Sequence, residues 1–236
     1  MKILKRILCL FIPVAKVRHR ILRHDASLIR VLDNGVERQP KWRELKHVFV
    51  HQTKNSVGNV VKIELPIASL HLHVCFEGNN NSVTIHAQTT GTWDILFHDE
   101  DGFVDIGANC SCVSCFMNVT GGGIRLGNDC MLSKQIVFYA NDAHTLFDKK
   151  TGKILNAKPH PIEVGHHCWL GQGSMLMKNA ILPNETVVGA GAVVTKKFTE
   201  PCTAIAGVPA KVVRQNIGWD RATPAQFVAQ THRRSG

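Results

Sequence analysis

The side chains best suited to proton transfer lie in a polar stretch beyond the middle of the chain. Residues 139–161 read YANDAHTLFDKKTGKILNAKPHP and contain Asp142 and His144, two positions apart. An imidazole titrates near neutral pH, so a histidine can take a proton from a hydroxyl group and later return it. Asp142 is a candidate to orient or polarise that ring, although residues so spaced share a face on a strand and need not meet on a loop. This stretch is the first candidate for a reactive site.

Other histidines are weaker candidates. The chain has 13 of them, and a lone histidine is usually structural or solvated. His166 and His167 precede Trp169, and His160 lies between two prolines. We interpret His166 and His167 as surface residues or as residues at the rim of a substrate site, and His160 as a weaker candidate still.

The eight cysteines favour free thiols over disulfides or a metal site, because their spacing is irregular. In the C-x-C-x-x-C run, an inward Ile106 makes Cys110 a small corner residue and Cys112 the next inward one, whereas Cys115 points elsewhere. Zinc ligands must converge on one point, so we interpret the run as core packing and expect no metal. Free thiols fit a reducing compartment.

A six-residue repeat is the element that must position these side chains. An aliphatic residue recurs at every sixth position, and a mostly small residue follows each one four positions later: Val164, Leu170, Leu176, Leu182, Val188 and Val194, with Cys168, Ser174, Ala180, Thr186, Ala192 and Phe198. Neither a helix nor a hairpin sheet has this period. The pattern predicts an all-β solenoid with three short strands per coil, in which residues eighteen apart stack.

The rest of the chain divides around this repeat. Alternating apolar residues from Val60 onward predict strands, and shorter hexapeptide runs begin at Ile106 and Leu126. Residues 29–51 are mixed and charged, and we interpret them as a connector with little regular structure. We predict a basic N-terminal extension or cap at 1–55, a β-helix domain at 56–206 with a protruding loop at 139–161, and a C-terminal tail at 207–236.

The positive charge is concentrated at one end. The formal net charge is +10, and residues 1–50 hold twelve Lys and Arg against four Asp and Glu. Few aromatic residues accompany these bases, which argues against nucleic acid and favours an anionic membrane surface or an acidic glycan. The apolar run within residues 1–24 is too short to span a bilayer. They fit a short amphipathic, partly helical segment that either caps the solenoid or docks peripherally on a membrane.

Four motifs together carry a family resemblance: NDAHTLFDKKTGKILN, VGHHCWLG, GAGAVVTK at 189–196 and AGVPAKVV at 206–213. They resemble the hexapeptide-repeat acyltransferases, in particular the O-acetyltransferases of bacterial surface polysaccharides, including those acting on sialic-acid-containing capsules. The resemblance covers roughly residues 60–220. It implies a left-handed parallel β-helix, acetyl-CoA as donor, a sugar acceptor, a homotrimer with sites between subunits, and a bacterial cytoplasmic location, with peripheral contact at the inner membrane through the basic N-terminus.

The resemblance also implies roles for particular residues. His144 becomes the general base, Asp142 its partner, and Trp169 a neighbour of donor and acceptor whose indole N–H is a candidate oxyanion donor. Flat glycine-containing coils would hold the pantetheine arm of coenzyme A, and nearby bases would meet its phosphates. The implied cofactor-binding group is Trp169, Gly171, Gly189, Ala190, Gly191, Lys196, Lys197, Pro209, Lys211 and Arg214.

Two alternatives stay open at the level of sequence. An N-acetyltransferase acting on a nucleotide-linked amino sugar needs a base as well, so His144 does not separate it from an O-acetyltransferase. A non-catalytic β-helix that scaffolds glycan assembly through its basic end is the other alternative. The Asp-Ala-His loop and the Gly-Val-Pro-Ala-Lys ending argue against this scaffold.

Overall fold

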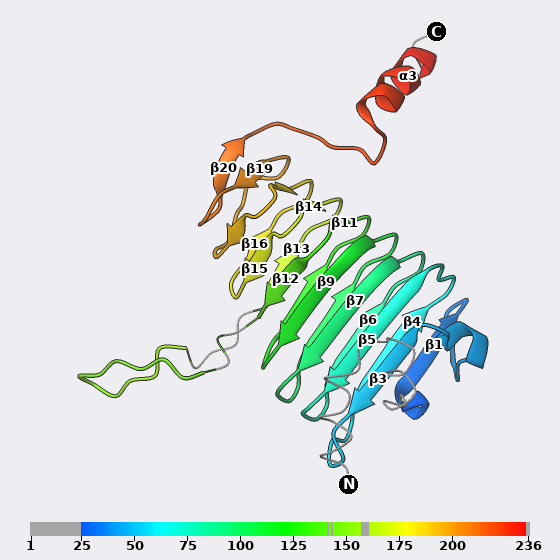
Figure 1. Ribbon diagram of the computed structural model, residues 1–236, viewed down its shortest axis with the longest axis vertical. Coiled ribbons are helices and arrows are strands. Elements are labelled where there is room, and N and C mark those ends of the chain that lie inside the picture. The colour runs from blue at the N-terminus through cyan, green and yellow to red at the C-terminus, as the bar shows by residue number, and fades with distance from the viewer. Residues whose placement is uncertain (1–24, 141, 143, 157–160, 235–236) are drawn as a thin grey trace, which may run out of the picture.

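The chain is built from stacked β-strand coils. The computed structural model describes residues 25–140, 142, 144–156 and 161–234. Figure 1 shows successive coils stacked along one long axis, with a loop projecting from the side after β12 and α3 (Pro224–Arg234) standing beyond the last coil. Neighbouring coils pair in parallel. The parallel β-helix predicted from the six-residue period is confirmed.

One face of the β-helix is a narrow sheet with one strand from each coil. Within the described residues it has eight strands, which pair in parallel except for an antiparallel hairpin formed by the last two in the order below. In sheet order they are β16 (Ile181–Leu182), β13 (Ile162–Val164), β10 (Gly123–Leu126), β8 (Phe103–Ile106), β6 (Ser82–Ile85), β4 (Val60–Glu64), β1 (Ile29–Asp33) and β2 (Val36–Arg38).

The remaining surface is a wider sheet that divides in two at β9 (Ser111–Val119). The start of β9 pairs with β11 and its end with β12, so each coil downstream has the three short strands expected of hexapeptides. Upstream, one long strand replaces two short ones. The other strands are β3 (Val48–Gln52), β5 (Leu70–Phe76), β7 (Thr90–Phe97), β11 (Met131–Leu132), β12 (Ile136–Tyr139), β14 (Trp169–Leu170), β15 (Met175–Met177), β17 (Val187–Val188), β18 (Val193–Val194), β19 (Ala204–Ala206) and β20 (Lys211–Arg214).

The core follows the six-residue repeat. All six aliphatics between Val164 and Val194 are buried, and so are the six corner residues that follow them. Val164 pairs with Leu182, and Leu170 pairs with Val188, so residues eighteen apart stack as expected. Burying one aliphatic side chain contributes about 1.5–3 kcal/mol, and here the contribution recurs in every coil.

The prediction that Cys115 points away from the core is wrong. Cys110, Cys112 and Cys115 are all buried. The register of β9 against β7 shifts at this point, because Gly91 pairs with Cys112 and Trp93 pairs with Cys115. The extra residue on β9 is a β-bulge, which turns Cys115 inward. Core packing of the cysteine run is confirmed.

The interpretation of residues 29–51 as a connector with little regular structure is also wrong. They form β1, β2 and β3, with the short 3-10 helices η1 (Ala26–Leu28) and η2 (Trp42–Leu45) beside them. β1 pairs with β4 and β3 pairs with β5, so both sheets begin upstream of residue 56. Short strands joined by charged turns lack the six-residue period, which is why the pattern missed them. The amphipathic segment at 1–24 lies outside the described residues.

Gly91 tests how closely the coils approach. Its φ is +100°, and a Cβ there would lie 1.7 Å from the carbonyl oxygen of Cys112. Gly91→Ala is expected to lower the free energy of unfolding by about 3 kcal/mol, because backbone strain adds to the overlap. Gly35 is the control, since its φ is +79° with nothing within 4 Å of an added Cβ. Chemical denaturation measures both variants, and equal losses would contradict close approach as the reason for Gly91.

Candidate active site

The loop between β12 and β13 forms an arm that stands out from the β-helix. Figure 1 shows it extending sideways from the coils. Phe147 and Ile154 form an antiparallel bridge, and the Asp148 carboxylate accepts backbone N–H bonds that close the turn at its tip. Leu146, Phe147, Ile154 and Leu155 are each more than half exposed. An exposed apolar cluster of this kind marks a surface that meets another molecule.

Asp142 and His144 lie at the base of this arm. The His144 side chain is exposed, and its backbone N–H donates to the Asp142 carbonyl at 2.6 Å. The Asp142 carboxylate accepts hydrogen bonds from Lys178 and from Asn156 Nδ2, the latter at 3.0 Å. These bonds hold the pKa of the Asp142 carboxyl below its usual range. Asp142 is therefore ionised at neutral pH and anchors the arm to Lys178 in the turn after β15.

Asn156 joins the two candidate residues in a way that sequence spacing does not reveal. Its Nδ2 also donates to the His144 carbonyl oxygen at 2.7 Å. The Asn156 amide thus bridges the Asp142 carboxylate and the His144 backbone across the two sides of the arm. Through Asn156 and Lys178, Asp142 fixes the backbone that carries the imidazole. Partners 14 and 36 residues away cannot be read from a motif two residues wide.

Trp169 lies on the outer surface of β14, as the repeat predicts. Its side chain is 37% exposed, and its Nε1–H donates to Ser133 Oγ at 3.4 Å. The Trp219 ring lies beside it, with centroids 6.2 Å apart and planes tilted by 42°. The Trp169 indole N–H and the Ser133 hydroxyl therefore form a small polar site on the outer surface of the coils.

Trp219 belongs to a C-terminal strap, residues 217–222, that sequence reasoning missed. The Trp219 ring stacks on His167 at 4.2 Å, and its Nε1–H donates to the His167 carbonyl oxygen at 2.7 Å. Arg221 donates to Asp129 Oδ1 at 2.9 Å and to Ser111 Oγ at 2.7 Å. The strap therefore binds polar surface residues of successive coils. Trp219 and Arg221 within the predicted C-terminal tail were the available signal.

His167 holds the strap and is not a free base. Its Nδ1 lies 2.7 Å from Asp129 Oδ2. Partial burial disfavours the charged ring, but bonding to Asp129 and to the Trp219 carbonyl outweighs burial, so the pKa of His167 is raised. His166 Nδ1 accepts the Asn128 backbone N–H at 2.9 Å. His160 lies outside the described residues.

The residues proposed for the donor gather at the C-terminal end of the β-helix. Ala190 and Gly191 are exposed, and Gly189 donates its N–H to Ile205 in the next coil. Gly171 is buried, and an added Cβ there would lie 2.6 Å from the Val188 carbonyl oxygen. Its role is close coil packing. The remaining members are Pro209 in the turn after β19 and the exposed side chains of Lys196, Lys197, Lys211 and Arg214.

Comparison with known proteins decides the family. The chain is 31% identical over 199 residues to the polysialic acid O-acetyltransferase of Neisseria meningitidis, which covers 74% of this chain and 90% of that protein. The chain belongs to the hexapeptide-repeat O-acetyltransferases. The polysialic acid O-acetyltransferase of Escherichia coli O1:K1 is 32% identical over 129 residues, 54% of this chain and 39% of that protein. No protein-family model matches the chain.

The fold of this O-acetyltransferase agrees with its family. The crystal structure of the polySia-specific acetyltransferase NeuO superposes with a TM-score of 0.61, covering 89% of this chain and 96% of that one at 22% identity. The left-handed parallel β-helix implied by the resemblance is therefore confirmed. An acyl-coenzyme A donor follows from the family. Within the described residues, no helix is long and apolar enough to cross a bilayer.

The strap is expected to loosen as the pH rises. The pKa of His167 is raised on folding, so its ion pair with Asp129 contributes fully below the unfolded value near 6.5 and is lost as pH rises through the folded value. Because both groups are partly exposed, the contribution is at most about 1 kcal/mol. Hydrogen exchange of residues 217–222 at pH 6 and pH 8, corrected for intrinsic rates, measures it. His167→Gln is the control, and an equal pH response in that variant would contradict the role of His167.

Proposed function

We propose that this protein transfers an acetyl group from acetyl-CoA to a hydroxyl group of a sialic-acid-containing capsular polysaccharide. The observation that carries the proposal is the match to the meningococcal polysialic acid O-acetyltransferase over 90% of that protein's length. A hydroxyl acceptor is favoured over an amine, because the matched relatives are named O-acetyltransferases. The donor points to the bacterial cytoplasm as the site of action.

His144 serves as the general base in this proposal. Its imidazole takes the proton of the acceptor hydroxyl as that oxygen attacks the thioester carbonyl carbon. The tetrahedral intermediate then collapses, the carbon–sulfur bond breaks, and the protonated imidazole returns its proton to the thiolate. Acceptor ester and free coenzyme A are the products. The attack is direct, so no covalent enzyme intermediate forms.

Other residues position this base and the donor. Asp142 acts on His144 through the arm backbone, by way of Asn156 and Lys178. The Trp169 indole N–H, which donates to Ser133 Oγ at 3.4 Å, would exchange that long bond for one to the charge developing on the thioester oxygen. Gly189, Ala190 and Gly191 present a flat surface for the pantetheine arm. Lys196, Lys197, Lys211 and Arg214 supply positive charge for the phosphates of coenzyme A.

We also propose that three copies of the chain assemble around the arms. Phe116, Val137 and Met175 lie in register on the outer face of β9, β12 and β15, with Tyr139 and Met177 beside them. Together with the exposed arm they form an apolar surface of the kind that a partner covers. A neighbouring copy placed there would close the space around His144, which the single chain leaves open.

Replacing the base should abolish turnover without unfolding the protein. His144→Ala is expected to lower kcat by about 10²–10⁴-fold, because the acceptor hydroxyl loses its proton acceptor. Release of free thiol from acetyl-CoA in the presence of polysialic acid measures the rate. His98→Ala is a matched control on the coil surface, where His98 pairs with Glu77. Unchanged kcat in His144→Ala would contradict the assignment.

Removing the apolar surface of the arm should weaken the assembly. Phe147→Ser combined with Leu155→Ser is expected to convert trimers to monomers at micromolar protein and to reduce turnover in parallel. Light scattering after gel filtration measures the mass. Val57→Ser is the control, because Val57 is 64% exposed and lies outside the arm. A trimer that survives the arm substitutions would show that the outer sheet face alone holds the copies.

A further inference from the structure

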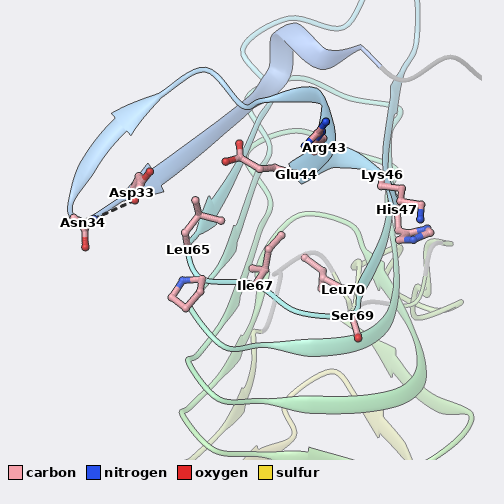
Figure 2. A pocket seen from close by; sticks show the side chains of 11 residues that line it. Asp33, Asn34, Arg43, Glu44, Lys46, His47, Leu65, Ile67, Ser69 and Leu70 are labelled. Atoms are coloured by element: carbon pink, nitrogen blue, oxygen red, sulfur yellow. Dashed lines mark hydrogen bonds between the residues drawn. The ribbon is translucent and has the colours of Figure 1, made fainter.

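A pocket lies at the N-terminal end of the β-helix, away from the arm. It has a volume of about 620 Å³ and is bounded by the β1–β2 turn, by η2 with the residues after it, and by the corner between β4 and β5. Figure 2 shows Lys46 and His47 on one side of the opening and Asp33 and Asn34 on the other. Leu65, Ile67 and Leu70 lie between them (Figure 2). Ligand pockets span about 300–1,000 Å³, so this one is large enough for a ligand.

The acidic groups of the pocket are already engaged in an internal bridge. Arg38 donates to Asp33 at 2.9 Å and to Glu44 at 2.7 Å, so it bridges the two carboxylates. Glu44 also accepts the Lys41 backbone N–H at 2.7 Å. The bond from Arg38 helps hold the pKa of the Glu44 carboxyl below its usual range. Both acids are committed to this internal bridge and are poor partners for an incoming cation.

Two basic side chains of the pocket remain available. Arg43 and Lys46 are exposed, and within the described part of the chain neither of them forms an ion pair. With Arg38 they give the pocket three basic side chains against the two acids, a net charge of +1 that favours an anion.

The floor of the pocket selects among anions. Leu65 and Ile67 give it an apolar surface, and Ile67 packs against the buried core. Ser69 and Asn34 add a hydroxyl and an amide that can bond to sugar hydroxyls. A small inorganic anion would leave the apolar floor uncovered. A sugar ring that bears a carboxylate has both an apolar face of C–H groups and an anionic group, and it matches this lining.

The pocket and the arm lie on one continuous sheet. β3, which follows Lys46 and His47, is connected to β12 through β5, β7 and β9, which is four strand steps. Neighbouring strands are about 4.8 Å apart, so the separation along the axis is roughly 19 Å. The pocket adjoins Leu70 at the start of β5, whereas Tyr139 at the base of the arm aligns with Cys75, so a further roughly 17 Å separates them across the sheet. A polysaccharide of several residues can span both distances. A chain held at the pocket would present another of its residues near His144 at a raised effective concentration.

We propose that the pocket beside Arg43 and Lys46 is a secondary binding site for the acidic polysaccharide acceptor, and this rests on the acceptor proposed above. The pocket holds a carboxylate-bearing sugar of the polymer while a distant residue of the same chain is acetylated. It takes no part in the chemistry, so it acts on the KM for long acceptors and leaves kcat unchanged.

The test compares a long acceptor with a short one. In Arg43→Ala combined with Lys46→Ala, the KM for polysialic acid is expected to rise at least about tenfold. The kcat, and the KM for a sialic acid oligosaccharide too short to reach both sites, are expected to stay unchanged. Lys54→Ala is the matched control, because Lys54 is exposed and does not line the pocket. Thermal melting of both proteins confirms that they are folded.

The other outcomes are distinguishable. Equal KM values for wild type and double variant on the polymer would overturn the proposal, and so would an equal rise for both acceptors, which would place the pocket within the active centre. Loss of binding to phosphatidylglycerol vesicles without any change in KM would assign the pocket to a membrane and also overturn it. If wild type acetylates no sialic acid polymer, the proposed function fails. Affinity electrophoresis with and without polysialic acid then still tests the pocket, and equal retardation of wild type and double variant by the polymer would overturn it.

Discussion

The narrow interior is the constraint on which the structure depends. Each coil buries its inward aliphatic side chains largely against the coils above and below it, so one side chain per face must fit a fixed width. Corner positions such as Cys168 and Ser174 are fully buried, and they accept little beyond small residues. Glycines such as Gly107 and Gly165 are required where the backbones of successive coils approach within 3 Å of an added Cβ. The six-residue period of the sequence results from this packing.

Because the frame is so constrained, chemistry is confined to its outer surface and to its interruptions. The arm interrupts the repeat once and carries His144 away from the coils. The strap crosses the coils from outside and contacts a column of polar turn residues, Asn109, Asp129 and His167, each directly before a buried corner cysteine and each with a positive φ. Because these polar residues recur at a fixed spacing, they can form hydrogen bonds with successive residues of the strap. The β-helix thus positions side chains from distant parts of the chain without altering its core.

The sequence predicts the frame much better than it predicts the attachments. Val164–Val194 and the interruption before it follow from periodicity, because every coil there obeys the same packing rule. Residues 29–51 were missed, since their strands alternate in polarity over irregular lengths and join through charged turns. The inward Cys115 depends on a bulge set by the register against β7. The contacts of Trp219 and Asn156 join residues that no local sequence pattern relates, so only the folded structure reveals them.

A β-helix also fixes distances between sites in units of one coil. The base of the arm and the N-terminal pocket are separated by strands that pair without a break, so their spacing cannot change without inserting or deleting a coil. Such rigidity suits an acceptor made of identical units, because a polymer can always offer some residue at the required distance. A small acceptor has no such freedom and would gain nothing from a second site. The geometry of the frame and the repetitive chemistry of the proposed acceptor are therefore matched.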